Sequence, residues 1–203
     1  MTETIAPTEP RRRGRRLKAL LAAGLVLGAG GAVTLAAWND SEFVTGTFSA
    51  GRFNLVGSTD GTTYADHPTA GSPAVAAFTV NAANLTPGDV AAAPFAVQLA
   101  SGTTSDATVT VSAAGTTGTV SQLSYQLLQT TSFGCTATTT GTALVPAGQA
   151  VGSAPGGVTF TLAKGAAGAA GAPVNLCFKV TAGAGLVQGQ TGTATWQFQA
   201  ASQ

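Results

Sequence analysis

Few residues of this chain could carry out covalent or acid–base chemistry, and the two cysteines are the most informative of them. Cys135 and Cys177 are the only cysteines in 203 residues, and an even number in an exported protein favours a disulfide. The two cysteines are 42 positions apart, and closing a loop of this length could contribute roughly 4 kcal/mol in the chain-entropy model. Two separate buried thiols are the alternative. Zinc is disfavoured because two cysteines and one histidine lack the usual ligand spacing.

The titratable side chains offer little for catalysis. His67 is the single histidine, which excludes an H-E-x-x-H motif and any site that needs two imidazoles. Asp66 could orient that imidazole beside a nucleophile, but a polar loop before Pro68 is the simpler interpretation. Asp60 and Asp66 bracket a loop with oxygen ligands for Ca²⁺, yet two carboxylates are too few to define a site. With neither G-x-S-x-G nor a P-loop present, the sequence predicts no enzyme, no cofactor and no metal.

The positive charge is concentrated before an uncharged N-terminal segment. Six of the nine basic residues precede residue 19, and residues 19–38 carry no charge. A basic n-region (1–18), an apolar h-region (19–35) and the small residues Ala36 and Ala37 are typical of a secretory signal helix. Cleavage after Ala37 would leave Trp38 first, and cleavage after Ala36 is nearly as good. The run is also long enough for a retained membrane anchor, but its four glycines make it weakly hydrophobic for one.

The remaining residues, 38–203, have the size of one ordinary secreted domain. They carry three basic and six acidic side chains, a formal net charge of −3. Because phosphate binding needs a basic face, this composition excludes a nucleic-acid-binding protein. Contact with a membrane is expected only through the signal segment before cleavage.

Alternating apolar residues predict strands throughout this domain. Six segments show the pattern: 95–99, 107–113, 123–127, 158–162, 174–180 and 193–200. Phe78 with Val80, and Phe53 with Leu55 after a bulge at Gly51, mark two more. Without interleaved helices, about eight such strands predict an all-β fold, an antiparallel jelly-roll-like β-sandwich.

Two local features refine this expectation. Thr86-Pro87-Gly88-Asp89 has the composition of a tight turn, with proline at the second position and glycine at the third. Cys177 lies between Leu176 and Phe178, so it faces away from the apolar side of its strand. The predicted disulfide therefore lies outside the main core.

Three segments carry a resemblance to a known family. Residues 36–40 (A-A-W-N-D) and 47–55 (T-F-S-A-G-R-F-N-L) resemble the start of the TasA/camelysin family, whose pattern is two small residues, an aromatic residue and a polar aspartate, then T-F-x-x-G-x-[LF]-[DN]-L. Residues 84–89 (N-L-T-P-G-D) are similar to the family's N-L-x-P-G-D turn. Residues 196–203 resemble its closing strand, while the middle of the chain matches only in strand character.

The resemblance implies a secreted jelly-roll subunit of biofilm matrix fibres, processed by a SipW-type signal peptidase. Its partner would be a second copy of itself in a head-to-tail homopolymer, to which the mature N-terminal segment adds a strand. Carried over to this chain, the donor segment is residues 38–48, with Trp38, Asn39, Asp40, Phe43, Val44 and Phe48 as its main residues. Camelysin-type relatives have been described as metallopeptidases, but this sequence offers no matching ligand set.

The distribution of charge points independently to assembly. No charged residue occurs in 107–163 or in 180–203. Natural edge strands usually carry lysine, proline or inward-pointing charges that block pairing with other chains. An uncharged edge and a free extended N-terminus together permit strand addition between subunits. The alternatives are a monomeric surface or adhesive β-sandwich and, second, a camelysin-like metallopeptidase.

Overall fold

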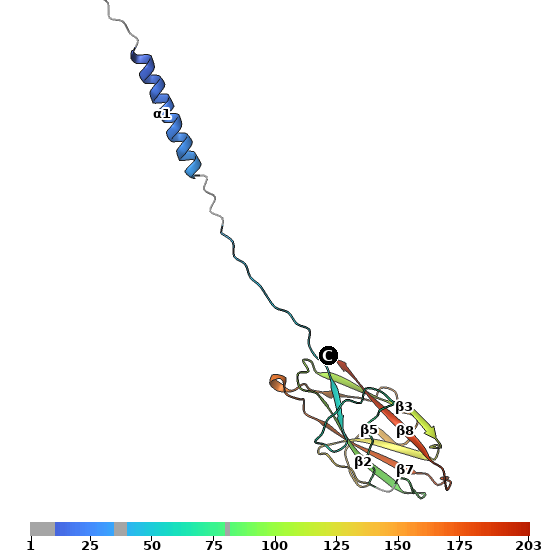
Figure 1. The fold of residues 1–203 in the computed structure, drawn as a ribbon. Helices are drawn as coiled ribbons and strands as arrows, with labels where there is room; N and C mark the ends of the chain where they lie inside the picture. The colour runs from blue at the N-terminus through green and yellow to red at the C-terminus, as the bar shows by residue number, and fades with distance from the viewer. Residues whose placement is uncertain (1–10, 35–39, 80–81) are drawn as a thin grey trace, which may run out of the picture. The chain divides into compact units, whose positions relative to one another are not determined.

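The computed structural model describes residues 11–34, 40–79 and 82–203, which divide into two units, Met1–Phe48 and Ser49–Gln203. In the first unit, α1 spans Arg11–Thr34, within the predicted signal segment (Figure 1). Among the described residues, no helix combines the length and hydropathy needed to cross a bilayer. The predicted cleavage residues, Ala37 and Trp38, lie outside the described residues, as does Asn39.

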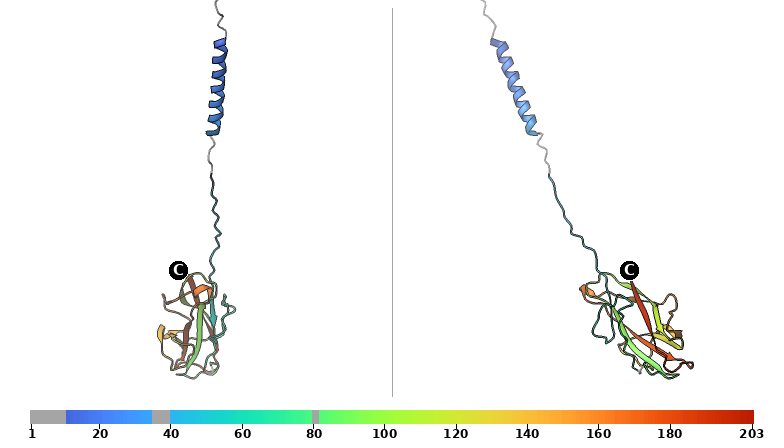
Figure 2. Two further views of the ribbon diagram at one scale, coloured as in Figure 1. Left: turned by 90° about the vertical axis from the view of Figure 1, so that its left-hand side faces the viewer. Right: turned by 45° about the vertical axis from the view of Figure 1, so that its right-hand side comes forward.

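In the second unit the described residues form eight strands in two antiparallel sheets (Figures 1 and 2). The five-stranded sheet has the order β1-β2-β7-β4-β5, and the three-stranded sheet has the order β6-β3-β8. The bounds are β1 Leu55–Ser58, β2 Val90–Leu99, β3 Ala107–Gly118, β4 Leu123–Thr130, β5 Thr142–Ala150, β6 Thr159–Leu162, β7 Val174–Ala182 and β8 Gly192–Ser202. A short 3₁₀ helix, η1 (Ala166–Gly168), precedes β7.

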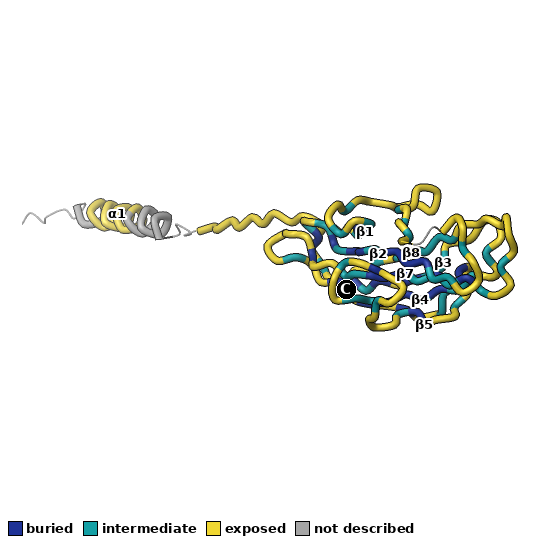
Figure 3. The backbone as a smooth tube through the Cα atoms, turned by 90° about the horizontal axis from the view of Figure 1, so that it is seen from below, coloured by how far each residue is buried: buried dark blue, intermediate teal, exposed yellow. Residues whose placement is uncertain are grey.

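One apolar core joins the two sheets, and the alternation of side chains explains it. On β7, Leu176, Phe178 and Val180 face the core, and on β3 Val109 and Val111 meet them from the other sheet. Successive side chains of a strand point to opposite faces, as on β6, where Phe160 and Leu162 are buried and Thr159 and Thr161 are exposed. Figure 3 shows the buried residues along the strands and the exposed ones in the loops. The predicted all-β sandwich is confirmed, and its jelly-roll character stays a prediction.

The predicted strands are confirmed with two exceptions. All six alternating segments lie in β2, β3, β4, β6, β7 and β8, apart from Val158 just before β6. Leu55 begins β1, whereas Phe53, predicted with it, precedes the strand. Phe78 lies in no strand, which contradicts the prediction, and Val80 lies outside the described residues. β5 was not predicted, because Pro146 and Gly148 interrupt its alternation. No bulge occurs at Gly51; the β3–β8 pairing shifts register between Ala113 and Gly115 instead.

The disulfide lies where the alternation places it. Cys135 and Cys177 are bonded, with 5.1 Å between their Cα atoms. Together with Ala92 and Leu128 they form a small buried cluster separate from the main core. The bond therefore fixes the loop between β4 and β5 to the outer face of the five-stranded sheet. A disulfide is typical of proteins that fold in an oxidising compartment.

The turn before β2 also has the predicted geometry. The Asp89 N–H donates to the Thr86 carbonyl oxygen at 3.0 Å, and Gly88 has φ of 94°, a conformation that glycine adopts without steric cost. The Asp89 carboxylate accepts hydrogen bonds from the Thr86 N–H and hydroxyl. These bonds lower the pKa of Asp89.

Removal of the disulfide tests its contribution to stability. We expect the Cys135→Ala/Cys177→Ala variant to have a free energy of unfolding roughly 2–5 kcal/mol below that of the unchanged protein, because the unfolded chain gains freedom. Urea denaturation measures the difference, and the unchanged protein under reducing conditions should match the variant. Equal midpoints for the oxidised protein and the variant would show that the bond does not stabilise the fold.

Candidate functional site

Three of the four sheet edges are shielded from further strand pairing. β1 has four residues, and Gly57 exchanges two backbone hydrogen bonds of 3.0 Å with Ala65 on its outer side. β5 contains Pro146 and has an irregular register with β4. β6 is only four residues long. Short strands, prolines and bulges are the usual protection against edge-to-edge pairing.

β8 itself has none of these protections, because the extra residue in its pairing with β3 is Ala114 of β3. It is an eleven-residue edge strand with no charged residue and no proline, and it pairs only with β3. In one half, the Gln203 N–H donates to the Asp106 carbonyl oxygen; in the other, the Thr119 N–H donates to the Thr191 carbonyl oxygen. The direction of the backbone N–H and C=O groups alternates along an antiparallel strand. The residues whose backbone groups point away from β3 are therefore Gly192, Ala194, Trp196, Phe198, Ala200 and Ser202. Among the described residues, none supplies a partner for this side of β8.

A large groove lies beside this open edge. Its volume is about 1260 Å³, and every residue in the range 192–200 lines it, so the strand edge itself forms one wall. Its floor comes from the inner face of the five-stranded sheet, including Leu55 of β1, Phe95 of β2 and Phe178 of β7. Gly57 also lines it, and a Cβ atom there would lie 2.6 Å from the Phe95 ring, so a larger residue would displace that ring. The groove is therefore lined mainly by apolar side chains and bounded by a backbone edge that can accept a strand.

Aromatic side chains of both sheets meet at the groove. The Trp196 ring centroid lies 4.7 Å from that of Phe178 and 5.2 Å from that of Tyr125. The Phe198 ring lies 5.5 Å from the ring of Phe95. Trp196 and Phe198 stay half-buried although they pack against the core. Their remaining exposed area is apolar surface that an added chain would remove from water.

Two polar atoms of this aromatic cluster lack a hydrogen-bond partner in the described part of the chain. They are the Tyr125 Oη and the Trp196 Nε1, and both are buried. Burial raises the pKa of the Tyr125 phenol. A buried polar atom without a partner costs about 1–3 kcal/mol, so such atoms are rare in finished structures.

The predicted donor segment presents apolar side chains to solvent. Residues 40–48 form no helix or strand. Phe43 is 96% exposed, Val44 is 100% exposed and Phe48 is 95% exposed. Exposing three large apolar side chains of a nine-residue segment to water is unfavourable, and covering them with another surface would lower the free energy. Asp40 is described and exposed, whereas Trp38 and Asn39 lie outside the described residues.

The titratable residues singled out in the sequence form no catalytic cluster. Asp66 and His67 both line the groove and are exposed. The Asp60 carboxylate accepts hydrogen bonds from the Thr63 N–H at 2.7 Å, the Thr62 N–H at 2.8 Å and the Ser58 hydroxyl at 2.9 Å, so a turn already occupies it. No group of three or more metal-ligating side chains occurs within the described ranges.

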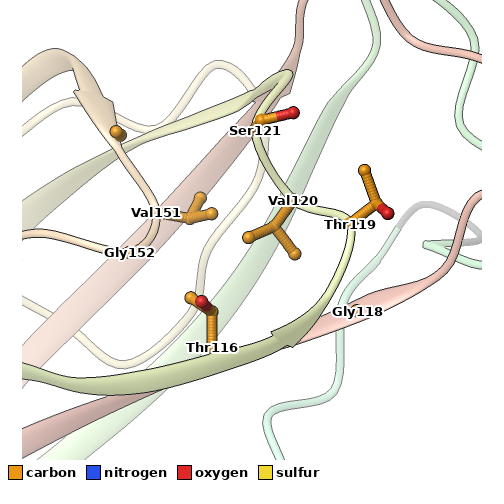
Figure 4. Close-up of a pocket in the computed structure, with 8 residues that line it drawn as sticks. Thr116, Gly118, Thr119, Val120, Ser121, Val151 and Gly152 are labelled. Carbon is orange, nitrogen blue, oxygen red and sulfur yellow. The ribbon is translucent and has the colours of Figure 1, made fainter.

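A second pocket, of about 420 Å³, lies at one end of the sandwich (Figure 4). Threonine, serine, glycine, alanine and valine side chains line it: Thr116, Gly118, Thr119, Val120, Ser121, Ala150, Val151 and Gly152. None of these residues titrates or holds a metal. The groove beside β8 is the stronger candidate, because it combines apolar surface with an unpaired backbone edge.

The chain matches no protein-family model and no curated protein in comparisons with known proteins. The sequence resemblance described above is therefore carried by its quoted motifs alone. The function has to be argued from β8, the groove and the exposed N-terminal segment.

The Asp60 turn predicts a specific acid response. Because the hydrogen bonds from Thr63, Thr62 and Ser58 hold the pKa of Asp60 well below its usual range, the ionised form stabilises the folded state. This contribution is present above the unfolded-state pKa of about 3.9 and is lost as the pH falls below it. We expect the melting temperature of the unchanged protein to fall more between pH 4.5 and pH 2 than that of Asp60→Asn, which keeps an acceptor oxygen but does not titrate. Parallel melting curves for both proteins would contradict this assignment.

Proposed function

We propose that this protein is a secreted structural subunit of extracellular fibres, assembled by donation of the N-terminal segment of one copy to the open edge of the next. The observation that carries the proposal is the uncharged, unpaired edge of β8 beside an aromatic groove. The occupant is residues 38–48 of a second copy. Backbone hydrogen bonds to β8 would supply affinity, and alternate side chains entering the groove would supply specificity.

The chemistry of the donor segment fits the groove. Val44 and Phe48 share one face of an extended segment with Gly46, while Phe43 lies on the other. The apolar face can cover Trp196 and Phe198, and the small Gly46 leaves room for an aromatic ring between its two neighbours. A homopolymer built this way is head-to-tail, because donor and acceptor are different surfaces of the same chain.

Export follows from the same proposal. The basic segment followed by an apolar run supports a signal sequence, and cleavage between Ala37 and Trp38 by a SipW-type signal peptidase would free the donor segment. The Cys135–Cys177 disulfide supports an oxidising, extracellular location. The fibres are those of a biofilm matrix in the TasA/camelysin family that the N-terminal motif resembles.

A monomeric adhesive domain is the second candidate. The outer face of the three-stranded sheet presents hydroxyl and amide side chains without any charge: Thr108, Thr110, Thr159, Thr161, Gln197 and Gln199. Such groups can hydrogen-bond a neutral glycan. This candidate predicts a monomer that binds matrix polysaccharides on a glycan array and gains nothing from its N-terminal segment.

Truncation tests donation directly. The protein beginning at Trp38 should form fibres in electron micrographs, and the protein beginning at Ser49 should stay monomeric in size-exclusion chromatography, because it lacks the donor but keeps the sandwich. A synthetic peptide of residues 38–50 with the substitution Trp38→Phe should bind the truncated protein and shift the fluorescence of Trp196, which is then the single tryptophan of the mixture. Two monomeric proteins at high concentration would refute the proposal.

A pair of lysine substitutions on β8 locates the acceptor edge. Ala200 lines the groove and is half-buried, whereas Ala201, the next residue of the same strand, is exposed and does not line the groove. We expect Ala200→Lys in the protein beginning at Trp38 to abolish fibres, because it places a charge where the donor must pack. Ala201→Lys adds the same charge outside the groove and should still assemble. Fibres of normal length from Ala200→Lys would place the acceptor elsewhere.

A further inference from the structure

A second segment of the chain also lines the groove. Residues 73–76 and 78 line it together with residues of β8. Ala74, Ala76 and Phe78 are half-buried, while Val75 and Ala77 are exposed. Burial of every second residue is the pattern of an extended strand with one face on a core. Phe78 itself packs against the main core.

This 73–79 segment nevertheless belongs to no sheet. Its one backbone hydrogen bond runs from the Thr79 N–H to the Ala92 carbonyl oxygen of β2, at 2.7 Å. Among the described residues, nothing bonds to the backbone of residues 73–78. The segment thus has the alternating burial of a strand without its ladder of hydrogen bonds, and it ends beside Phe78, where the sequence predicts a strand with Val80.

The Thr79 bond fixes the direction of one backbone group of the segment, because the Thr79 N–H points toward β2. N–H and C=O groups of successive residues in an extended chain point to opposite sides. In a fully extended segment, residues 74, 76 and 78 would therefore direct their backbone groups away from β2. On β8, the even-numbered residues from Ala194 to Ser202 direct theirs away from β3. The groove is thus lined by one unpaired strand edge and by a segment without backbone partners of its own.

We propose that the 73–79 segment is a latent strand that pairs with the second edge of the inserted donor, so that the donor is held between it and β8. This inference rests on the proposed function, because it assigns a second contact to the same donor. Residues 74, 76 and 78 would bond the donor backbone, and Phe78 would cover its apolar side chains. The inserted segment would then have both edges paired and no new edge exposed.

Two proline substitutions separate the two sides of the segment. In the protein beginning at Ser49, Ala76→Pro removes a backbone N–H that faces away from β2, whereas Ala77→Pro removes one on the opposite side. We expect Ala76→Pro to weaken binding of the 38–50 peptide about tenfold by calorimetry, and Ala77→Pro to change it less than twofold. Neither substitution removes a hydrogen bond that the unbound chain makes, so both proteins should melt like the unchanged one.

Amide exchange on the protein beginning at Ser49, without any substitution, gives an independent measurement that does not depend on how the variants fold. Peptide binding should slow exchange at Ala74, Ala76 and Phe78 at least tenfold, and leave Val75 and Ala77 unaffected. If the peptide binds but neither exchange nor the proline pair distinguishes the two sides, the latent strand is wrong and donation to β8 stands. If the peptide does not bind the unchanged protein at all, the proposed function itself fails.

Discussion

The structure depends on a mismatch in width between its two sheets. A three-stranded sheet faces a five-stranded one across a single core, so part of the wider sheet's inner face has no strand above it. The groove lies on the β8 side, where β1 and β2 contribute to its floor. Two needs therefore coincide there. Trp196 and Phe198 retain exposed apolar area, and the backbone of β8 retains unpaired groups, so an extended peptide that is apolar on one face satisfies both.

The absence of charge on β8 matters because of this coincidence. An edge strand that must stay single usually carries lysine, proline or a bulge, as β5 does with Pro146. The hydroxyl and amide side chains of Thr195, Gln197 and Gln199 keep the outer face of β8 soluble and oppose no incoming strand. At the other end of the chain, Phe43, Val44 and Phe48 expose apolar side chains to water. The N-terminal segment needs an apolar surface to cover these side chains, and β8 needs a strand to pair with its backbone, so contact between copies would satisfy both.

The sequence predicts faces much better than neighbours. Alternation in 174–180 or 193–200 identifies which side chains are buried, and it correctly places Cys177 outside the core. It fails for β5, where Pro146 and Gly148 hide a strand that is held by pairing with β4 rather than by its own pattern. It also fails at Phe78, where the pattern is present but no strand pairs with it. Alternation carries no information on the order of the strands within a sheet, so the open edge of β8 could not be located before that order was known.

The order of the strands also suggests why each groove would accept only one added strand. A donor that paired with β8 alone would carry its own unpaired edge into solvent, and identical edges invite continued stacking of the cross-β kind. A donor held between β8 and the 73–79 segment has both edges occupied, so each groove accepts one segment. Growth can then continue only through the next copy's groove, which favours a linear polymer over a widening sheet. In the proposed fibre, the backbone of residues 73–78, which makes no hydrogen bond within the described part of the single chain, would therefore limit each groove to one donor.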